Sequence, residues 1–292
     1  MMKIGLNTNT FPGETLDVLI PLAKDFGIRH LELWGSNLEP NGKESVNFYA
    51  FSDKNLRKAK EQVEAAGMTV GALSSGLGLD TQMTSDPELF SQELVTTVEA
   101  AAFFGAKVVN HYSDKIQPGL TPEIERLHQY FDAAVRRAEE LGVILALENE
   151  AGDASRTPEN MLKIVESFDS PNFKTNFDGT NYYHASCEAF PYAYELLQKH
   201  IAYVHIKNGR LYRPGGFCPD TKWFGGAMTC EPGTIYYCEA KDGVVNIDGL
   251  VHRLAQDGYQ GMCTLEPHTT RENAIRAIHG EVRYLRATDL FE

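Results

Sequence analysis

Three features of the sequence predict an α/β protein that folds as one (β/α)8 TIM barrel over residues 1–292. Eight short apolar runs alternate with helical patterns along the whole chain. A glycine closes several helical patterns directly before an apolar run, and the first of these glycines recur about 40 residues apart, the length of one βα unit. No composition break marks a second domain. A doubly wound open sheet is the runner-up, but it rarely needs eight strands in such regular order.

The predicted strands are apolar runs bounded by turn or helix signals. Strands that are buried on both faces of a parallel sheet read as near-continuous apolar sequence, and the run that ends at Glu148 is the clearest case. In chain order the predicted strands are Lys3–Asn7, His30–Trp34, Thr69–Leu73, Lys107–Tyr112, Val143–Glu148, Phe173–Asp178, Ile201–Lys207 and Gly261–Glu266.

Amphipathic spacing and start signals predict the helices between these strands. The first helix has an apolar stripe at i, i+3, i+4 and i+7 spacing. The stripe consists of Leu16, Leu19, Ile20, Ala23 and Phe26. Later helices are expected to open with a capping side chain before a proline, at residues 85–87, 121–123 and 157–159. Glycines such as Gly27 and Gly142 suit the helix ends, because the residue after a helix often takes the left-handed conformation.

Residues 208–245 form an oversized connection between the seventh strand and the next helix. The segment is rich in glycine and proline but also contains Trp223, Phe224, Tyr236 and Tyr237, so we expect it to be ordered. Long ordered loops in compact domains are usually lids or binding loops, and sometimes subunit contacts. The segment is therefore predicted to be a lid on the active-site face or a contact in a homo-oligomer.

Composition and charge exclude several classes of protein. Hydrophobic residues make up 42% and charged residues 23%, as in ordinary globular domains. The net charge of −13, without a local basic cluster, argues against nucleic acid as a partner. We find no signal peptide and no apolar run near the ~20 residues of a membrane helix, so we expect no membrane association and a cytoplasmic location. The five cysteines form no C-x-x-C pair and are predicted to be isolated thiols.

Four of the predicted strands end in a residue that can bind a metal ion. These residues are Glu148, Asp178, His205 and Glu266. Each one alone is better explained as a loop cap or as the partner of a lysine. Side chains alternate along a strand, however, and the carboxyl ends of the strands meet at the face where such barrels keep their sites. Three carboxylates brought together repel one another strongly unless a cation lies between them, so we predict one bound divalent metal.

The chemistry of this set narrows the choice of metal. Three oxygens and one imidazole nitrogen suit a hard to borderline cation. Mn²⁺ is the first expectation, followed by Mg²⁺ or Co²⁺. Zn²⁺ is less favoured because no cysteine joins the set.

The segments that carry these residues resemble the xylose isomerase-like TIM barrels, and within them the sugar phosphate isomerases and epimerases. The matching segments are Leu-Ala-Leu-Glu148-Asn, Asn-Phe-Asp178-x-x-Asn181, Val-His205-Ile-Lys207-Asn and Leu-Glu266-Pro, with weaker matches around Asn7 and Glu32. The resemblance spans almost the whole chain and is specific for the metal site rather than for a substrate. It implies that Glu148 and Glu266 are both metal ligands and acid/base groups.

The same dual role follows from the chemistry of sugar isomerisation. Moving a proton next to a carbonyl needs an enediolate, and a metal that bridges the carbonyl and hydroxyl oxygens stabilises its charge. Glu148 and Glu266 end the fifth and eighth strands and approach a substrate from different sides, so one removes the proton and the other returns it. The predicted function is a metal-dependent isomerase or epimerase of a ketose or keto-sugar. The absence of a phosphate-binding turn favours an unphosphorylated substrate.

Six further residues are assigned to the surroundings of this site. They are His111, Asn181, His184 and Lys207 as substrate-binding residues, and Glu150 and His268 as groups that support the ligands. A satisfied core histidine is an equal alternative for His111, and a carboxylate partner is the alternative for Lys207. In some relatives a histidine lies three residues after the metal aspartate. Here Asn181 occupies that position and His184 is the nearest histidine, which leaves the substrate contacts open.

Three rival functions are weighed against the isomerase. A metal-dependent lyase or dehydratase, acting on a keto-sugar, keto-glycoside or inosose by β-elimination, would use the same residues for its first step. A DNA-repair endonuclease would need several metal ions and a basic groove, and the charge of −13 speaks against it. A carbohydrate-binding or regulatory barrel would have no reason to keep acid/base carboxylates at a metal.

Overall fold

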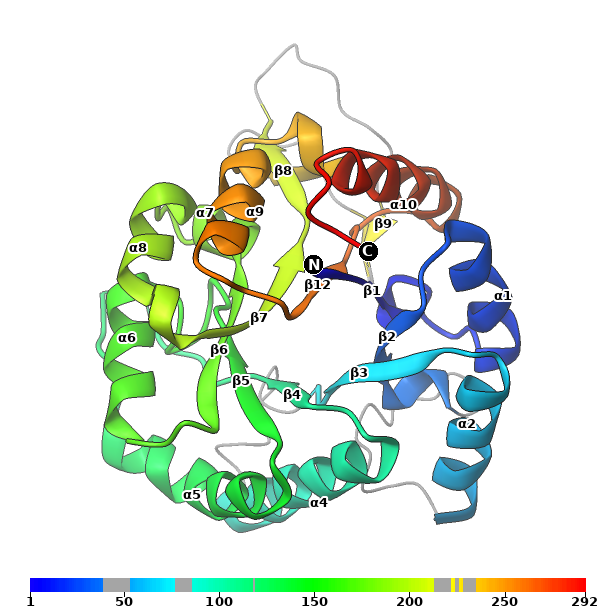
Figure 1. Ribbon diagram of the computed structural model, residues 1–292. Coiled ribbons are helices and arrows are strands. Elements are labelled where there is room, and N and C mark those ends of the chain that lie inside the picture. Colours follow the sequence, from blue (N-terminus) through cyan, green and yellow to red (C-terminus); the bar gives the residue numbers. More distant parts are fainter. Residues whose placement is uncertain (39–52, 77–85, 118, 213–221, 224–225, 228–234) are drawn as a thin grey trace.

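The computed structural model describes residues 1–38, 53–76, 86–117, 119–212, 222–223, 226–227 and 235–292. Within them, eight parallel strands close into a barrel, and helices surround it (Figure 1). The predicted single-domain (β/α)8 barrel is confirmed. Among the described residues, no helix is long and apolar enough to cross a membrane.

All eight predicted strands are present, with ends that differ from the predicted ends by at most one residue. They are β1 (Lys3–Asn7), β2 (His30–Trp34), β3 (Thr69–Ser74), β4 (Val108–His111), β5 (Ile144–Glu148), β6 (Phe173–Asp178), β7 (Ile201–Ile206) and β12 (Met262–Leu265). Their order around the barrel is β1-β12-β7-β6-β5-β4-β3-β2. The four strands with the predicted ligands, β5, β6, β7 and β12, are therefore neighbours.

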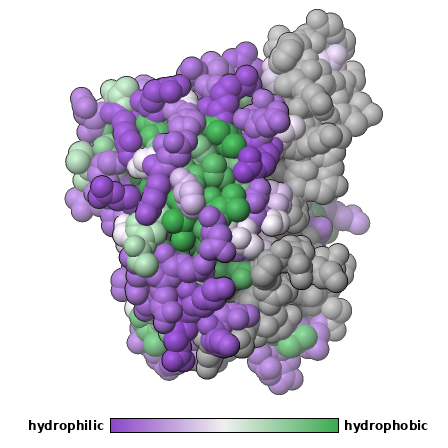
Figure 2. Space-filling view, turned by 90° about the vertical axis from the view of Figure 1, so that its right-hand side faces the viewer, coloured by the Kyte–Doolittle hydropathy of each residue, from purple (hydrophilic) through white to green (hydrophobic). Residues whose placement is uncertain are grey.

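The outer layer consists of helices that bury one apolar face each. The described helices are α1 (Leu16–Phe26), α2 (Asp53–Ala65), α4 (Pro87–Phe104), α5 (Ile124–Leu141), α6 (Pro158–Ser167), α7 (Gly179–His184), α8 (Tyr194–Leu197), α9 (Ile247–Gln256) and α10 (Arg271–Arg286). In α1 the predicted stripe faces the barrel, with Ile20 at its half-buried edge. Gly27 ends this helix at φ +75°, the left-handed conformation that the sequence predicts. Figure 2 shows the outer face over α1 and α2, where hydrophilic side chains surround a smaller hydrophobic area.

Two of the three predicted helix starts are confirmed. Asp86 accepts a hydrogen bond from the Leu89 N–H at the start of α4, and Thr157 accepts one from the Asn160 N–H at the start of α6. The start predicted at residues 121–123 is wrong, since α5 begins at Ile124. Pro122 is buried and packs as part of the preceding loop instead of opening the helix.

The long connection after β7 continues as a hairpin of β8 (Asn208–Leu211) and β11 (Ile235–Cys238). A second small pair consists of β9 (Lys222–Trp223) and β10 (Gly226–Ala227). Much of the segment 208–245 that is predicted to be a lid or an interface lies outside the described residues. The described cysteines Cys187, Cys238 and Cys263 carry free thiols.

The inward-facing side chains form two layers along the barrel axis, one apolar and, two residues further along each strand, one polar. The apolar layer is a small cluster of buried side chains, namely Ala72, Val108, Ala146, Tyr203 and Met262. Two residues further along each of these strands, the inward position is polar and buried. These positions are Ser74, Asn110, Glu148, His205 and Thr264. Because side chains alternate along a strand, the polar groups gather at the carboxyl end of the barrel.

Candidate active site

Four buried side chains converge at the carboxyl ends of β5, β6, β7 and β12. They are Glu148, Asp178, His205 and Glu266, the four predicted metal ligands. One potential ligand atom of each lies within 4.8 Å of the others. The register explains the convergence, because Asp178 pairs with His205, and His205 pairs with Thr264, two residues before Glu266. The four side chains that the strand ends single out in the sequence therefore lie together in the structure.

In each carboxylate of this cluster, one oxygen is held away from the centre by a hydrogen bond and the other faces the neighbouring cluster residues. Asn110 Nδ2 donates to Glu148 Oε2 at 2.8 Å, while Glu148 Oε1 lies 3.2 Å from His205 Nδ1. Oδ1 of Asp178 caps α7 by accepting hydrogen bonds from the backbone N–H groups of Thr180 and Asn181. Its Oδ2 faces the centre. Such support fixes the orientation of a ligand before a metal binds.

His205 and Glu266 follow the same rule. The Nε2 of His205 lies 2.8 Å from Glu32 Oε2, which leaves Nδ1 facing Glu148 and Glu266. A carboxylate on the outer nitrogen is the usual partner of a metal-binding histidine. Asn7 Nδ2 donates to Glu266 Oε1 at 2.8 Å, so Glu266 Oε2 faces the centre. All four side chains are thus aimed at one point.

Lys207 lies against the open side of the cluster. Its Nζ is 3.0 Å from Asp178 Oδ2 and 3.0 Å from Glu266 Oε2, and the side chain is buried. The sequence predicts that Lys207 either stabilises a substrate oxyanion or pairs with a ligand carboxylate. The structure places it in the second arrangement, from which it still reaches the centre of the site.

The pKa values of the cluster are set by burial and by the charged groups packed around each residue. Burial opposes ionisation of Glu266, but Lys207 and His205 outweigh it and hold the pKa of this carboxyl well below its usual range. Burial raises the pKa of Asp178 to about 6, although the Lys207 ammonium opposes the shift. Burial also opposes the charged form of His205, yet the carboxylates around it raise its pKa well above the ordinary value. The site therefore attracts positive charge.

The residues fit a divalent metal ion. Four buried carboxyl groups surround His205 and Lys207, the fourth being Glu32, and the half-buried Glu150 lies next to them. In the described part of the chain, the basic side chains paired with these carboxyl groups are Lys207, His205 and His268. A cation held by three carboxylate oxygens and one imidazole nitrogen would compensate this excess of negative charge.

Of the residues predicted to surround the cluster, Asn181 and His268 contact its carboxylates directly, and His184 does not. Asn181 Nδ2 donates to Glu148 Oε1 at 3.1 Å and to Glu150 Oε1 at 3.2 Å, so it bridges the two carboxyl groups. Burial, followed by the charge of Glu148, raises the pKa of Glu150 well above its usual range. His268 Nε2 lies 3.5 Å from Glu266 Oε2. His184 is more distant and exchanges a hydrogen bond of 3.1 Å with the Tyr237 hydroxyl.

His111 is the predicted substrate-binding residue that the structure does not bring to the cluster. Its ring lies between β4 and α5, with centroids 4.9 Å from that of Phe131 and 5.5 Å from that of Phe173. Burial lowers the pKa of His111 to about 3. Because Asn110 points inward, its neighbour His111 must point outward. The structure therefore places His111 in the core and away from the cluster.

Three residues that hold the cluster side chains were given no role in the sequence analysis, although Asn7 and Glu32 lie in its weaker family matches. Glu32 orients His205, Asn110 holds Glu148, and Asn7 holds Glu266. A charged residue inside the apolar strand His30–Trp34 was the available signal for Glu32. Asn7 and Asn110 are polar residues at or near strand ends, which by itself does not distinguish them from loop residues.

The chain was compared with known proteins. The family model described as xylose isomerase-like TIM barrel matches residues 20–288. Comparison with curated protein sequences finds no significant match. Among solved structures, the probable 3-DHS dehydratase AsbF from Bacillus anthracis is similar at a TM-score of 0.70 and 16% identity, covering 98% of this chain and 99% of that one.

Two further solved structures share the fold over nearly their whole length. The 3-keto-D-glucoside 4-epimerase YcjR from E. coli has a TM-score of 0.69 at 17% identity, with 98% of this chain and 100% of that chain covered. The IolI protein, solved with a zinc atom, has a TM-score of 0.68 at 17% identity, with 99% and 98% covered. Identities this low show the fold alone. Because the family model covers most of the sequence, the chain belongs to the xylose isomerase-like TIM barrel family.

Proposed function

We propose that this protein is a divalent-metal-dependent isomerase or epimerase of a ketose or keto-sugar, with Glu148 and Glu266 as its acid/base groups. The observation that carries the proposal is the arrangement of these two glutamates. They extend from β5 and β12, the two ends of the run of four neighbouring strands that carries the cluster, and in each one oxygen is held by an asparagine at 2.8 Å. A pair of carboxylates placed in this way can act on two positions of one substrate.

Glu148, Asp178, His205 and Glu266 would hold the cation. A divalent cation bound there supplies a Lewis acid that lowers the energy of negative charge on a sugar oxygen. Mn²⁺ is our first choice for this donor set, with Mg²⁺ or Co²⁺ next. Zn²⁺ is less favoured because no cysteine joins the set, but the zinc atom in the IolI structure makes it a necessary member of any metal comparison.

The protein's own residues move the proton. One glutamate accepts the proton from the carbon beside the carbonyl, and the other donates a proton to the opposite face or to the neighbouring carbon. Asn110 and Asn7 keep the reacting carboxylates in place. Lys207, 3.0 Å from Glu266, donates a hydrogen bond to the substrate oxygen that gains negative charge. General acid–base catalysis of this kind contributes roughly 10²–10⁴-fold to the rate.

Proton NMR in D₂O tests this function directly. The protein is loaded in turn with Mn²⁺, Mg²⁺, Co²⁺ or Zn²⁺ and incubated with a panel of ketoses and keto-sugars. We expect deuterium to enter at the carbon next to the carbonyl and an isomer of the substrate to accumulate. Absence of both exchange and product for the whole panel, with stoichiometric metal bound, would contradict the proposal.

A second candidate is a lyase or dehydratase on a keto-sugar, keto-glycoside or inosose. The position of Lys207 favours it, because an ammonium beside Glu266 can donate a proton to a leaving hydroxyl or glycosyl oxygen. Glu148 or Glu266 would remove the same proton in the first step. The NMR experiment separates the two reactions, since elimination gives an unsaturated product and releases water or an aglycone, whereas isomerisation releases neither.

A further inference from the structure

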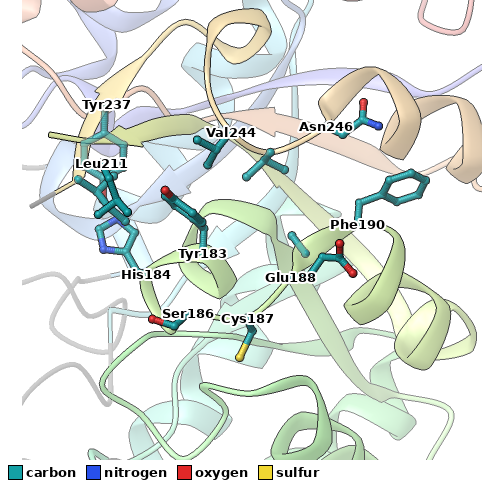
Figure 3. A pocket seen from close by; sticks show the side chains of 13 residues that line it. Tyr183, His184, Ser186, Cys187, Glu188, Phe190, Leu211, Tyr237, Val244 and Asn246 are labelled. Carbon is teal, nitrogen blue, oxygen red and sulfur yellow. The ribbon is translucent and has the colours of Figure 1, made fainter. Parts of the chain in front are cut away.

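A groove with a volume of about 910 Å³ has His184 and Tyr237 among its lining residues. Three segments form it: the stretch from α7 into the short helix η4 (Ala189–Ala193), the hairpin of β8 and β11, and the loop before α9. Figure 3 shows His184 and Tyr237 at one end of the groove and Phe190 and Asn246 at the other. Pockets of roughly 300–1,000 Å³ are typical for organic ligands.

The walls of this groove are more apolar than polar. The side chains that give it this character are Tyr183, Phe190, Leu211, Ile235, Val244 and Val245. Leu211 is 44% exposed and Val244 is 47% exposed, and both are among the most exposed large hydrophobic residues that the structure describes. Exposed apolar side chains that gather in one concavity mark a binding site. Among the described lining residues there is no lysine or arginine, and the charged one is Glu188, so the groove does not suit a phosphate or another anion.

A continuous row of side chains connects the groove with the cluster. The rings of His184 and Tyr237 stack with centroids 5.7 Å apart, and the Tyr237 ring meets His268 at 4.7 Å. His268 in turn lies 3.5 Å from Glu266. The groove therefore begins only one layer of side chains away from a proposed acid/base residue.

We propose that this groove binds the apolar aglycone of a keto-glycoside whose sugar reacts at the metal cluster. This inference rests on the proposed function and narrows its substrate class from free sugars to glycosides with an aryl or similarly apolar group. The groove provides the apolar contact area, and His184 and Tyr237 lie where the link between sugar and aglycone would pass.

Two probes test the aglycone site by activity. Methyl and phenyl 3-keto-β-D-glucoside are compared in D₂O with the Mn²⁺-loaded protein. Burying the phenyl group in the groove should lower KM about tenfold relative to the methyl glycoside. Val244→Asp and Leu211→Asp should remove this advantage and leave the methyl glycoside within twofold of the unmodified protein. Leu89→Asp is the matched control, because Leu89 is 48% exposed and does not line the groove.

A binding measurement tests the aglycone site separately from the proposed catalytic function. Calorimetric titration with the unreactive methyl and phenyl β-D-glucosides measures the groove without any turnover. Tighter binding of the phenyl glycoside that Val244→Asp abolishes supports the aglycone site even if no keto-sugar reacts. Equal binding of the two glycosides overturns it even if free keto-sugars are isomerised. Light scattering measures the oligomeric state of Val244→Asp. If this state changes and the affinity for both glycosides falls equally, the aglycone site is also overturned, and the groove is a contact between copies of the chain.

Discussion

Two buried histidines lie near the same end of the barrel in opposite surroundings. His205, on β7, points into the barrel among carboxylates, which raise its pKa well above the ordinary value against the opposing effect of burial. His111, on β4, points into the layer between the barrel and α5, where burial among phenyl rings lowers its pKa to about 3. Both side chains are almost completely inaccessible to solvent.

The difference comes from strand alternation and not from the residue type. On β4 the inward position at this level belongs to Asn110, so His111 faces outward; on β7 the inward position belongs to His205 itself. One residue of register decides whether a histidine joins the carboxylate cluster or packs in the core. Three substitutions test whether the two histidines differ in activity, metal affinity and pH-dependent stability as their surroundings suggest.

The largest effect is expected from Glu266→Gln, which removes one carboxylate from the surroundings of His205. The amide cannot accept a proton from carbon, so we expect turnover of a keto-sugar to fall by at least about 10³-fold. The rate is measured as deuterium incorporation by NMR. Glu125→Gln, an exposed position on α5, is the control and should retain full activity. An active Glu266→Gln with bound metal would disprove the assigned acid/base role.

A smaller effect, on Mn²⁺ affinity, is expected from Glu32→Gln. This substitution removes the carboxylate that contacts His205 and has no counterpart beside His111. Without that charge, His205 is a weaker ligand and its ring is less well oriented, so Mn²⁺ affinity should fall roughly 10–100-fold. Calorimetric titration with Mn²⁺ measures the change. Tyr203→Phe is a matched control, because it removes a donor to Glu32 at 2.7 Å but keeps the carboxylate. Unchanged affinity in Glu32→Gln would show that Glu32 has no part in metal binding.

The smallest effect concerns His111→Phe, which should leave activity within about twofold and alter only acid stability. The folded pKa of about 3 lies below the unfolded value of 6.5. As the pH falls below 6.5, the unfolded chain takes up a proton that the folded chain does not, so the wild type loses stability that the variant keeps. The difference in the free energy of unfolding between variant and wild type should grow by about 2 kcal/mol from pH 8 to pH 5.

Urea unfolding at the two pH values measures this difference. His252→Phe, at an exposed position of α9, is the control and should show no such growth. A parallel pH dependence of wild type and His111→Phe would mean that His111 can be protonated inside the fold.

The eight strands and the four clustered side chains could be predicted because they depend on patterns of a few residues. Apolar runs that end in Glu148, Asp178 or Glu266 give both the strand and its inward position. His111 could not be placed in this way, because Asn110 and His111 are adjacent and both suit a strand end. The sequence does not say which of them points inward until the register with β5, Asn110 with Ala146, is known.

The supporting residues were harder to predict because their partners are far away in the sequence. Glu32 contacts His205 across 173 residues, and Asn110 contacts Glu148 across 38. No local pattern relates such pairs. The apolar groove depends on three separate segments and was likewise not predictable, although Tyr237 and His184 were noted for other reasons.

The hydrogen bond from Asn7 to Glu266 joins β1 to the residue after β12, two positions 259 residues apart. The two strands pair where the barrel closes, so this contact to Glu266 needs both ends of the chain in place. A cation that binds the closed barrel and not the unfolded chain adds to the stability of the folded state as its concentration rises. The supply of metal would then set how many newly made chains persist as folded protein.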